Sequence, residues 1–175
     1  MNPRYNYTDM HLHSKFSWDA RQTIDEIAAR ALEKGVLYAG VAEHIDFPED
    51  HRQPAPDFDF EGYSDAVDKA REKFPGLRKG LEAGEPYLFR EIFEEFIREK
   101  EIDFILGSVH MVDGLTPVYD SYFSAYDDLD KAYGDYFKEV KELVRYGNFD
   151  VAAHLNIVHR RGAEFNKSFT YEKFR

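Results

Sequence analysis

The chain has 175 residues, of which 43% are hydrophobic and 33% are charged, and its formal net charge is −11. This composition predicts one folded domain with its own core, and the acidic balance argues against a broad nucleic-acid surface. No apolar run approaches the roughly 18 residues of a membrane helix. Cysteine is absent, so a bound metal must be held by histidines and carboxylates, and the cytoplasm is the expected location.

The first predicted strand begins near Tyr7 and ends in the pair His11 and His13. Residues two apart in an extended strand project to the same face, so these two imidazoles can chelate one metal ion. One such pair is weak evidence by itself. It gains weight only if later segments end in the same way.

A helix and a second strand follow. Thr23 and Glu26 have the spacing of a capping box, and the apolar periodicity after them predicts a helix that ends at Gly35. Residues 36–42 are typical of a strand and lead directly into Glu43-His44. A strand, a helix and a strand in this order favour parallel pairing.

The rest of the chain continues this alternation. Its three further strands end in Glu82, His110 and His154. The predicted helices cover residues 61–73, 88–100 and 129–144, and the predicted strands cover 77–81, 103–109 and 149–153. Two loops are predicted, over residues 47–60 and 111–125, and the first of them contains His51.

All five predicted strands therefore end in residues that can bind a metal. In parallel β/α folds, active residues gather at the carboxyl ends of the strands. The sequence thus predicts an α/β fold, organised as a single domain over residues 1–175, with one metal site built from these endings.

The motifs around these residues resemble the histidinol-phosphate phosphatase branch of the PHP (polymerase and histidinol phosphatase) superfamily. They are Asp9-Met10-His11-Leu12-His13-Ser14, Ser17-Trp18-Asp19, Glu43-His44-Ile45-Asp46-Phe47-Pro48, Gly80-Leu81-Glu82-Ala83-Gly84-Glu85-Pro86, Gly107-Ser108-Val109-His110 and Ala153-His154-Leu155. The resemblance implies a parallel β/α barrel of the distorted (β/α)7 type, with about five β/α units in this chain, and two to three divalent ions of zinc, manganese or iron. It also implies hydrolysis of L-histidinol phosphate, in histidine biosynthesis, by a metal-activated hydroxide.

The same resemblance gives the site residues their roles. His11 and His13 match ligands of the first metal, and Glu82 matches a carboxylate that bridges the first and second metals. His110 and His154 match the other ligands of the second metal. Asp19 and His44 match ligands of the third metal. Arg160 matches a phosphate-binding arginine, for which a solvated surface arginine is the alternative. Glu82 and Arg160 are the expected catalytic residues, and the partner is a small phosphorylated substrate.

Three neighbouring side chains are less informative. Glu43 points to the strand face opposite His44, which favours a supporting role over direct coordination. Glu85 either orients a ligand or is solvated. His159 is expected on a loop and not as a ligand.

Other functions stay open. The family has two further strands, the last ending in an Asp-x-His motif that is absent here, so the domain is expected to lack the C-terminal β/α units. A phosphoesterase acting on nucleotides or oligonucleotides is one alternative. A truncated, non-catalytic metal-binding module is the other.

Overall fold

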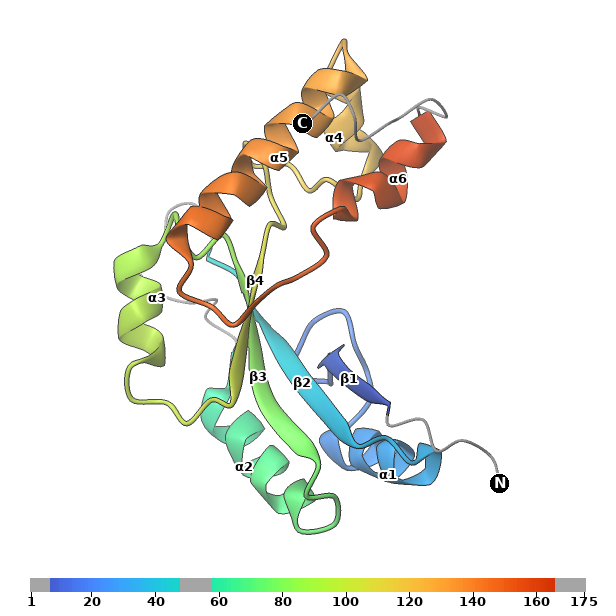
Figure 1. Cartoon of the computed structure of the whole chain (residues 1–175), viewed down its shortest axis with the longest axis vertical. Coiled ribbons are helices and arrows are strands. Elements are labelled where there is room, and N and C mark those ends of the chain that lie inside the picture. The colour runs from blue at the N-terminus through green and yellow to red at the C-terminus, as the bar shows by residue number, and fades with distance from the viewer. Residues whose placement is uncertain (1–6, 48–57, 166–175) are drawn as a thin grey trace.

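The computed structural model describes residues 7–47 and 58–165, so most of the proline-rich loop and His51 lie outside the described residues. Helices and strands alternate along the chain much as predicted (Figure 1). In chain order they are β1 (Thr8–Leu12), α1 (Ile24–Lys34), β2 (Tyr38–Ile45), α2 (Phe60–Arg71), β3 (Leu77–Gly84), α3 (Arg90–Ile97), β4 (Phe104–Ser108), α4 (Asp120–Ser124), α5 (Leu129–Tyr146), β5 (Val151–Ala152) and α6 (Ile157–Phe165).

The five strands form one parallel sheet in the order β1-β2-β3-β4-β5. Each strand lies beside the preceding one, so every crossover steps in the same direction. Such connections are right-handed as a rule. Helices α1 to α3 pack against the sheet, which curls into half of a barrel. The expectation of a parallel α/β fold is confirmed.

Helix α1 shows how local sequence sets an element boundary. The Thr23 hydroxyl accepts a hydrogen bond from the Glu26 backbone N–H at 3.2 Å, and the Glu26 carboxylate accepts one from the Thr23 N–H at 2.8 Å. At the other end Gly35 has φ = 67°, a left-handed conformation that glycine adopts without steric cost. The predicted capping box and stop are both confirmed.

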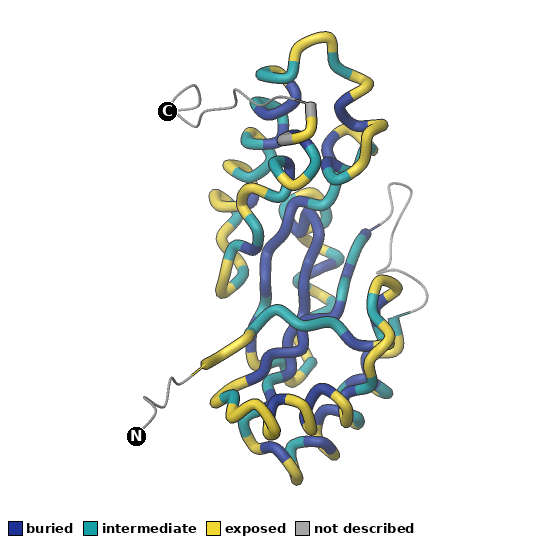
Figure 2. The backbone as a smooth tube through the Cα atoms, turned by 90° about the vertical axis from the view of Figure 1, so that its right-hand side faces the viewer, coloured by how far each residue is buried: buried dark blue, intermediate teal, exposed yellow. Residues whose placement is uncertain are grey.

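The described residues form three clusters of buried side chains, two of them large. Figure 2 shows that the strands are the most continuously buried part of the backbone. The larger cluster lies between the sheet and helices α1 to α3, around Val41, Leu81 and Phe93. The second joins α4, α5 and α6 around Tyr133 and Tyr136. Figure 1 shows these three helices grouped beyond the carboxyl ends of the strands.

The structure corrects two predicted loops. Residues 111–125 contain the short helix α4, which is held in place because Tyr122 and Phe123 are buried against neighbouring helices. His159 lies on helix α6, not on a loop, and its Nδ1 is 3.1 Å from the Tyr133 hydroxyl. In both segments tertiary packing of aromatic side chains outweighs a weak local preference.

Smaller differences concern element lengths. β2 and β3 extend past the predicted ends, so His44 and Glu82 lie within the strands. Helix α3 is shorter than predicted, and β5 has only two residues. No helix within the described residues has the length and apolar character needed to cross a bilayer.

Candidate metal centre

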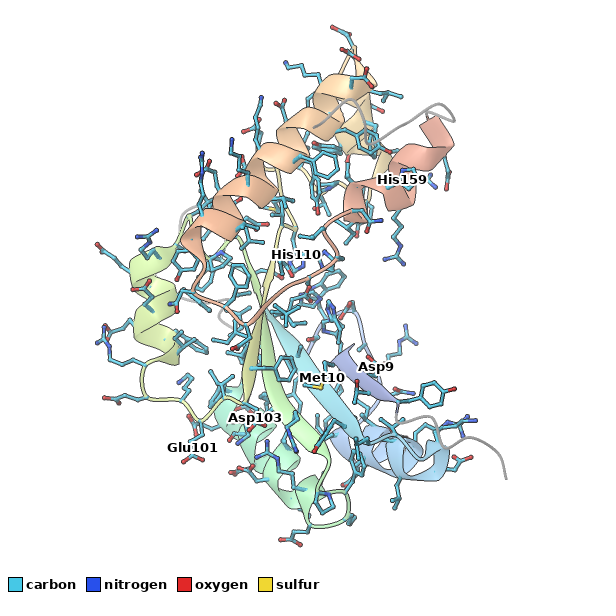
Figure 3. All side chains as sticks on the ribbon, viewed as in Figure 1. Asp9, Met10, Glu101, Asp103, His110 and His159 are labelled. Carbon is cyan, nitrogen blue, oxygen red and sulfur yellow. The ribbon has the colours of Figure 1, made fainter. Side chains whose placement is uncertain are left out.

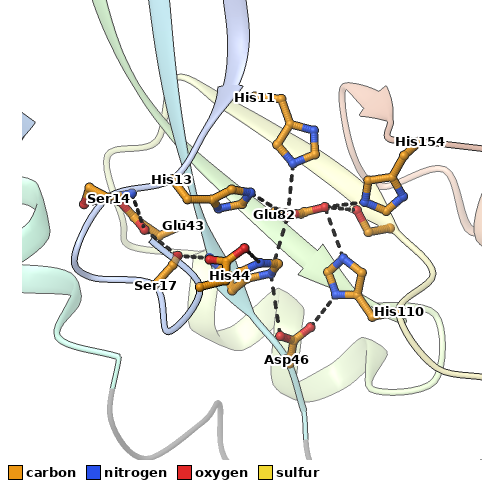
Figure 4. A network of polar contacts seen from close by, with 12 residues as sticks. His11, His13, Ser14, Ser17, Glu43, His44, Asp46, Glu82, His110 and His154 are labelled. Carbon is orange, nitrogen blue, oxygen red and sulfur yellow. Dashed lines mark hydrogen bonds and ion pairs between the residues drawn. The ribbon is translucent and has the colours of Figure 1, made fainter. Parts of the chain in front are cut away.

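Glu82 is the centre of a cluster of polar side chains at the carboxyl ends of the strands (Figure 4). It lies on β3 and is only 1% exposed. Five histidine rings, from the carboxyl ends of β1, β2 and β4 and from the segment after β5, surround its carboxylate. They are His11, His13, His44, His110 and His154.

One oxygen of Glu82 faces the segments that follow β4 and β5. Its Oε1 lies 2.7 Å from Nε2 of His154 and 3.1 Å from Nε2 of His110. The Ser108 hydroxyl donates a hydrogen bond of 2.7 Å to the same oxygen. The serine fixes the orientation of the carboxylate, and the two imidazoles and Oε1 form a group able to hold one metal ion.

The other oxygen of Glu82 faces β1 and β2. Its Oε2 lies 3.1 Å from Nε2 of His11, 3.4 Å from Nε2 of His13 and 3.4 Å from Nδ1 of His44. His11, His13 and Glu82 form a second group able to hold an ion. The two carboxylate oxygens thus divide the histidines into two sets, the arrangement expected of a bridging carboxylate.

A third group lies where the loop after β1 passes β2. His44 Nε2 is 3.4 Å from Asp19 Oδ2, and the His13 and His44 rings stack with centroids 4.4 Å apart. His13, Asp19 and His44 together could hold an ion. The Trp18 ring, 77% exposed, stacks on the outer side of His44 at 5.7 Å.

The residues present fit a metal centre. Oε2 of Glu82 and Nδ1 of His44 are buried, yet neither has a hydrogen-bond partner within the described part of the chain. A buried carboxylate oxygen without a partner is costly, and three ring nitrogens approach it without hydrogen-bond geometry. Zinc and similar divalent ions take imidazole nitrogen and carboxylate oxygen as ligands. One bound ion would therefore coordinate Oε2 of Glu82 and the ring nitrogens around it.

The electrostatics of the cluster agree with this geometry. Burial acts to raise the pKa of the Glu82 carboxyl, but the contacts with His11, His110 and His154 outweigh it and hold that pKa well below its ordinary value. Burial lowers the pKa of His13, and the neighbouring His44 adds to this effect. Glu82 is therefore ionised at neutral pH and His13 favours its neutral form, the states in which both ligate metals.

Glu43 supports the cluster from the opposite face of β2, as predicted. It is fully buried, and its carboxylate accepts hydrogen bonds from the Ser14 N–H at 3.1 Å, from the Ser14 hydroxyl at 2.5 Å and from the Ser17 hydroxyl. Burial raises its pKa, although these hydrogen bonds oppose that rise. Glu43 thus fixes the loop that carries Asp19 against the strand that carries His44.

The sequence left open whether Glu85 orients a ligand or is solvated. The side chain is buried, so it is not solvated. Its Oε1 accepts hydrogen bonds from the backbone N–H groups of His110 and, at 2.9 Å, Met111. Burial raises its pKa to about 7, with His110 acting in the opposite direction. The side chain therefore fixes the backbone at the end of β4.

Sequence reasoning gave no role to two further residues of the cluster. Ser108 orients Glu82, as described above, and Asp46 lies 2.7 Å from Nδ1 of His110. Both stand inside the motifs that carry the family resemblance, so motif position was an available signal. Their contacts, across 26 and 64 residues of chain, became visible only in the fold.

The cluster opens into a cavity of about 820 Å³. All seven predicted ligands line it or reach it, and so does Arg160 from α6. Arg160 is exposed and forms no ion pair with any described residue, whereas the neighbouring Arg161 pairs with Asp120 at 2.5 Å. Figure 3 shows His110 where the strands converge and His159 farther out on α6.

Comparison with known proteins agrees with this arrangement. The model of the PHP domain family matches residues 9–175. The chain belongs to the PHP domain family. The family resemblance inferred from the motifs is thereby confirmed.

Several relatives within this family have names. The chain is 28% identical over 170 residues to a probable histidinol-phosphatase of Clostridium acetobutylicum, covering 95% of this chain and 64% of the relative. It is 27% identical over 174 residues to the histidinol-phosphatase of Lactococcus lactis, covering 95% and 63%. The chain thus spans slightly less than two thirds of the length of these relatives.

A solved structure shares the fold of this PHP chain. The histidinol phosphate phosphatase of Lactococcus lactis, in complex with zinc, L-histidinol and phosphate, superposes with a TM-score of 0.85 at 23% identity. The match covers 97% of this chain and 65% of that protein. The curled half-barrel is therefore a PHP fold.

Proposed function

We propose that this chain carries the metal centre of a phosphatase that hydrolyses L-histidinol phosphate to L-histidinol and phosphate, in cytoplasmic histidine biosynthesis. The observation that carries the proposal is the buried Glu82 carboxylate, whose two oxygens face two separate sets of histidines in the wall of a cavity. The named relatives and the zinc-bound neighbour support the choice of reaction and of metal.

The proposal assigns the ligands in three sets. They are His11, His13 and Glu82 for a first ion, Glu82, His110 and His154 for a second, and Asp19 with His44, beside His13, for a third. Zinc, manganese and iron all accept such donors. When bound, such ions would lower the pKa of a water molecule and neutralise charge on the phosphoryl oxygens.

The protein's own groups have separate tasks. Glu82, held by Ser108, keeps the two ligand sets at a fixed separation. Arg160 faces the same cavity and forms no ion pair with another described residue, and its planar guanidinium suits the phosphate through two hydrogen bonds. We propose Arg160 as the residue that orients the phosphoryl group.

The cavity wall favours a small phosphomonoester over a nucleic-acid strand. Among the described residues that line the cavity, Arg160 is the one Lys or Arg side chain, and four lining residues are acidic. A nucleic-acid strand would need several cations along its backbone. Apolar side chains, including Trp18, Phe47 and Ile157, line the rest and would receive the organic part of the substrate.

The test is phosphate release by the zinc- or manganese-loaded protein from L-histidinol phosphate, nucleoside monophosphates and a single-stranded oligonucleotide. The proposal expects preference for L-histidinol phosphate. Preference for a nucleotide or oligonucleotide would reject L-histidinol phosphate as the substrate and would assign the chain to another reaction of the family. Tight metal binding without hydrolysis of any of these substrates would favour a metal-binding module.

A further inference from the structure

Asp46 lies directly after β2 and outside the ligand sets assigned above. Its Oδ1 is 2.7 Å from Nδ1 of His110, and the opposite ring nitrogen, Nε2, is 3.1 Å from Glu82 Oε1. A carboxylate can only accept a hydrogen bond, so the Nδ1–H of His110 donates to Asp46. Nε2 lies against the Glu82 carboxylate, and it is the nitrogen that would give up its proton to bind an ion there.

We propose that Asp46 is a positioning residue, which sets the tautomer and ring orientation of His110 for metal binding. This inference rests on the proposed metal centre. In metal sites, a ligating histidine commonly donates its second ring N–H to a carboxylate, which fixes the ring and raises its basicity. Asp46 would supply that carboxylate to a ligand of the ion between Glu82 and His154.

Asp46 and Glu82 contact opposite nitrogens of the His110 ring. Glu85 already fixes the backbone of His110 and Met111 through two N–H groups. The backbone is thereby held, and the orientation of the ring depends on these two side-chain contacts. The contact with Asp46 opposes rotation of the ring away from Glu82.

Gly84, the last residue of β3, makes room for this contact. A Cβ atom built at Gly84 would overlap Oδ1 of Asp46 and would come within 3.0 Å of Nδ1 of His110. Gly84 does not have a positive φ, so an alanine there would not strain the backbone but would displace the Asp46 carboxylate. The close approach of the two side chains therefore depends on the absence of a side chain at this position.

A second assignment of Asp46 must be separated from this one. His44, Asp46 and His110 lie close enough to form a metal group of their own, with Asp46 Oδ2 3.7 Å from Nδ1 of His44. In that case Asp46 would itself be a ligand. The two assignments differ in metal stoichiometry: loss of a ligand removes an ion, whereas loss of a positioning residue weakens binding.

The test measures zinc binding by competition with a chromogenic chelator, and needs no substrate. We expect Asp46→Ala to keep the wild-type number of zinc ions at saturation but to weaken one site by about 10- to 100-fold. Asp46→Asn, which keeps an accepting oxygen, should recover part of the loss. Asp65→Ala, at an exposed position on α2, is the matched control and should bind as wild type does.

Gly84→Ala gives an independent variant. It should weaken the same site, and most of its effect should vanish in an Asp46→Ala background, because the side chain it displaces is then missing. In nitrogen-15 NMR of the zinc-loaded protein, the Nδ1–H signal of His110 should be present in wild type and absent in Asp46→Ala. A merely structural role for Asp46 would not move this signal.

Three results would overturn the inference. Asp46→Ala with unchanged zinc affinity would show that the contact has no role in binding. A loss of one ion at saturation would make Asp46 a ligand. Wild-type protein that binds no zinc would remove the metal centre and this inference with it, whereas tight zinc binding without phosphatase activity would reject only the proposed reaction.

Discussion

His44 on β2 and Glu82 on β3 are register partners in neighbouring parallel strands, and Nδ1 of His44 lies 3.4 Å from Oε2 of Glu82. Partners in register project their side chains to the same face of the sheet at the same height. The strand pairing itself thus brings a histidine of one β/α unit to the carboxylate of the next. The position of Glu82 between β2 and β4 explains why one side chain can serve both flanking sets of histidines.

The first prediction concerns this carboxylate. Glu82→Gln should lower the metal content by at least one ion per chain and reduce phosphatase activity by more than about 100-fold, since even partners of metal ligands cost about 10- to 100-fold. Elemental analysis and phosphate release measure the two effects. Glu142→Gln, which is 49% exposed on α5, is the control and should change neither. Unchanged metal content in Glu82→Gln would reject the bridging role.

The second prediction concerns the cation in the cavity. Arg160→Ala should lower kcat/KM for the phosphorylated substrate by roughly 10- to 100-fold, the loss of about 1.5–3 kcal/mol for a hydrogen bond to a charged group. Metal content should stay at the wild-type value. Arg161→Ala is the matched control, because Arg161 pairs with Asp120 and is absent from the cavity lining. Equal kinetics in Arg160→Ala and wild type would show that Arg160 is a solvated surface arginine without a role in phosphate binding.

The sequence was sufficient to find most of this cluster. His11, His13, Glu82, His110 and His154 could be predicted to meet because parallel strands bring their carboxyl ends to one edge of a sheet. The contact of Asp19 with His44, at 3.4 Å, rested on the family resemblance, because Asp19 follows β1 on an irregular loop.

Other features depend on contacts between distant segments. Asp46 follows a predicted ligand by two residues, but its partner His110 lies 64 residues away, so no local pattern indicates the pair. Helix α6 was missed because it is short and contains Gly162, a weak helix former. A Cβ at Gly162 would overlap the Tyr133 hydroxyl, so close packing explains a glycine that local propensity disfavours.

The third prediction concerns the buried carboxylate behind the site. Glu43→Ala leaves the Ser14 N–H and the hydroxyls of Ser14 and Ser17 without their shared acceptor. Unpaired buried polar groups cost about 1–3 kcal/mol each, so we expect a loss of about 3 kcal/mol in the free energy of unfolding. In a chain of this size that lowers Tm by about 6–12 °C.

Thermal unfolding of the metal-free protein measures this effect without any contribution from bound ions. Glu33→Ala, at a position on α1 that is 63% exposed, is the control and should stay within about 0.5 kcal/mol of wild type. A melting temperature for Glu43→Ala equal to that of the control would show that Glu43 does not fix the loop after β1.

The most direct measurement of the central claim is anomalous X-ray scattering at the zinc edge from crystals of the zinc-loaded protein. We predict one peak between His11, His13 and Glu82 and another between Glu82, His110 and His154, each about 2.0–2.2 Å from the ligating atoms. A fully active, zinc-dependent protein whose peaks lie elsewhere, with the five rings still packed around a metal-free Glu82, would contradict the account.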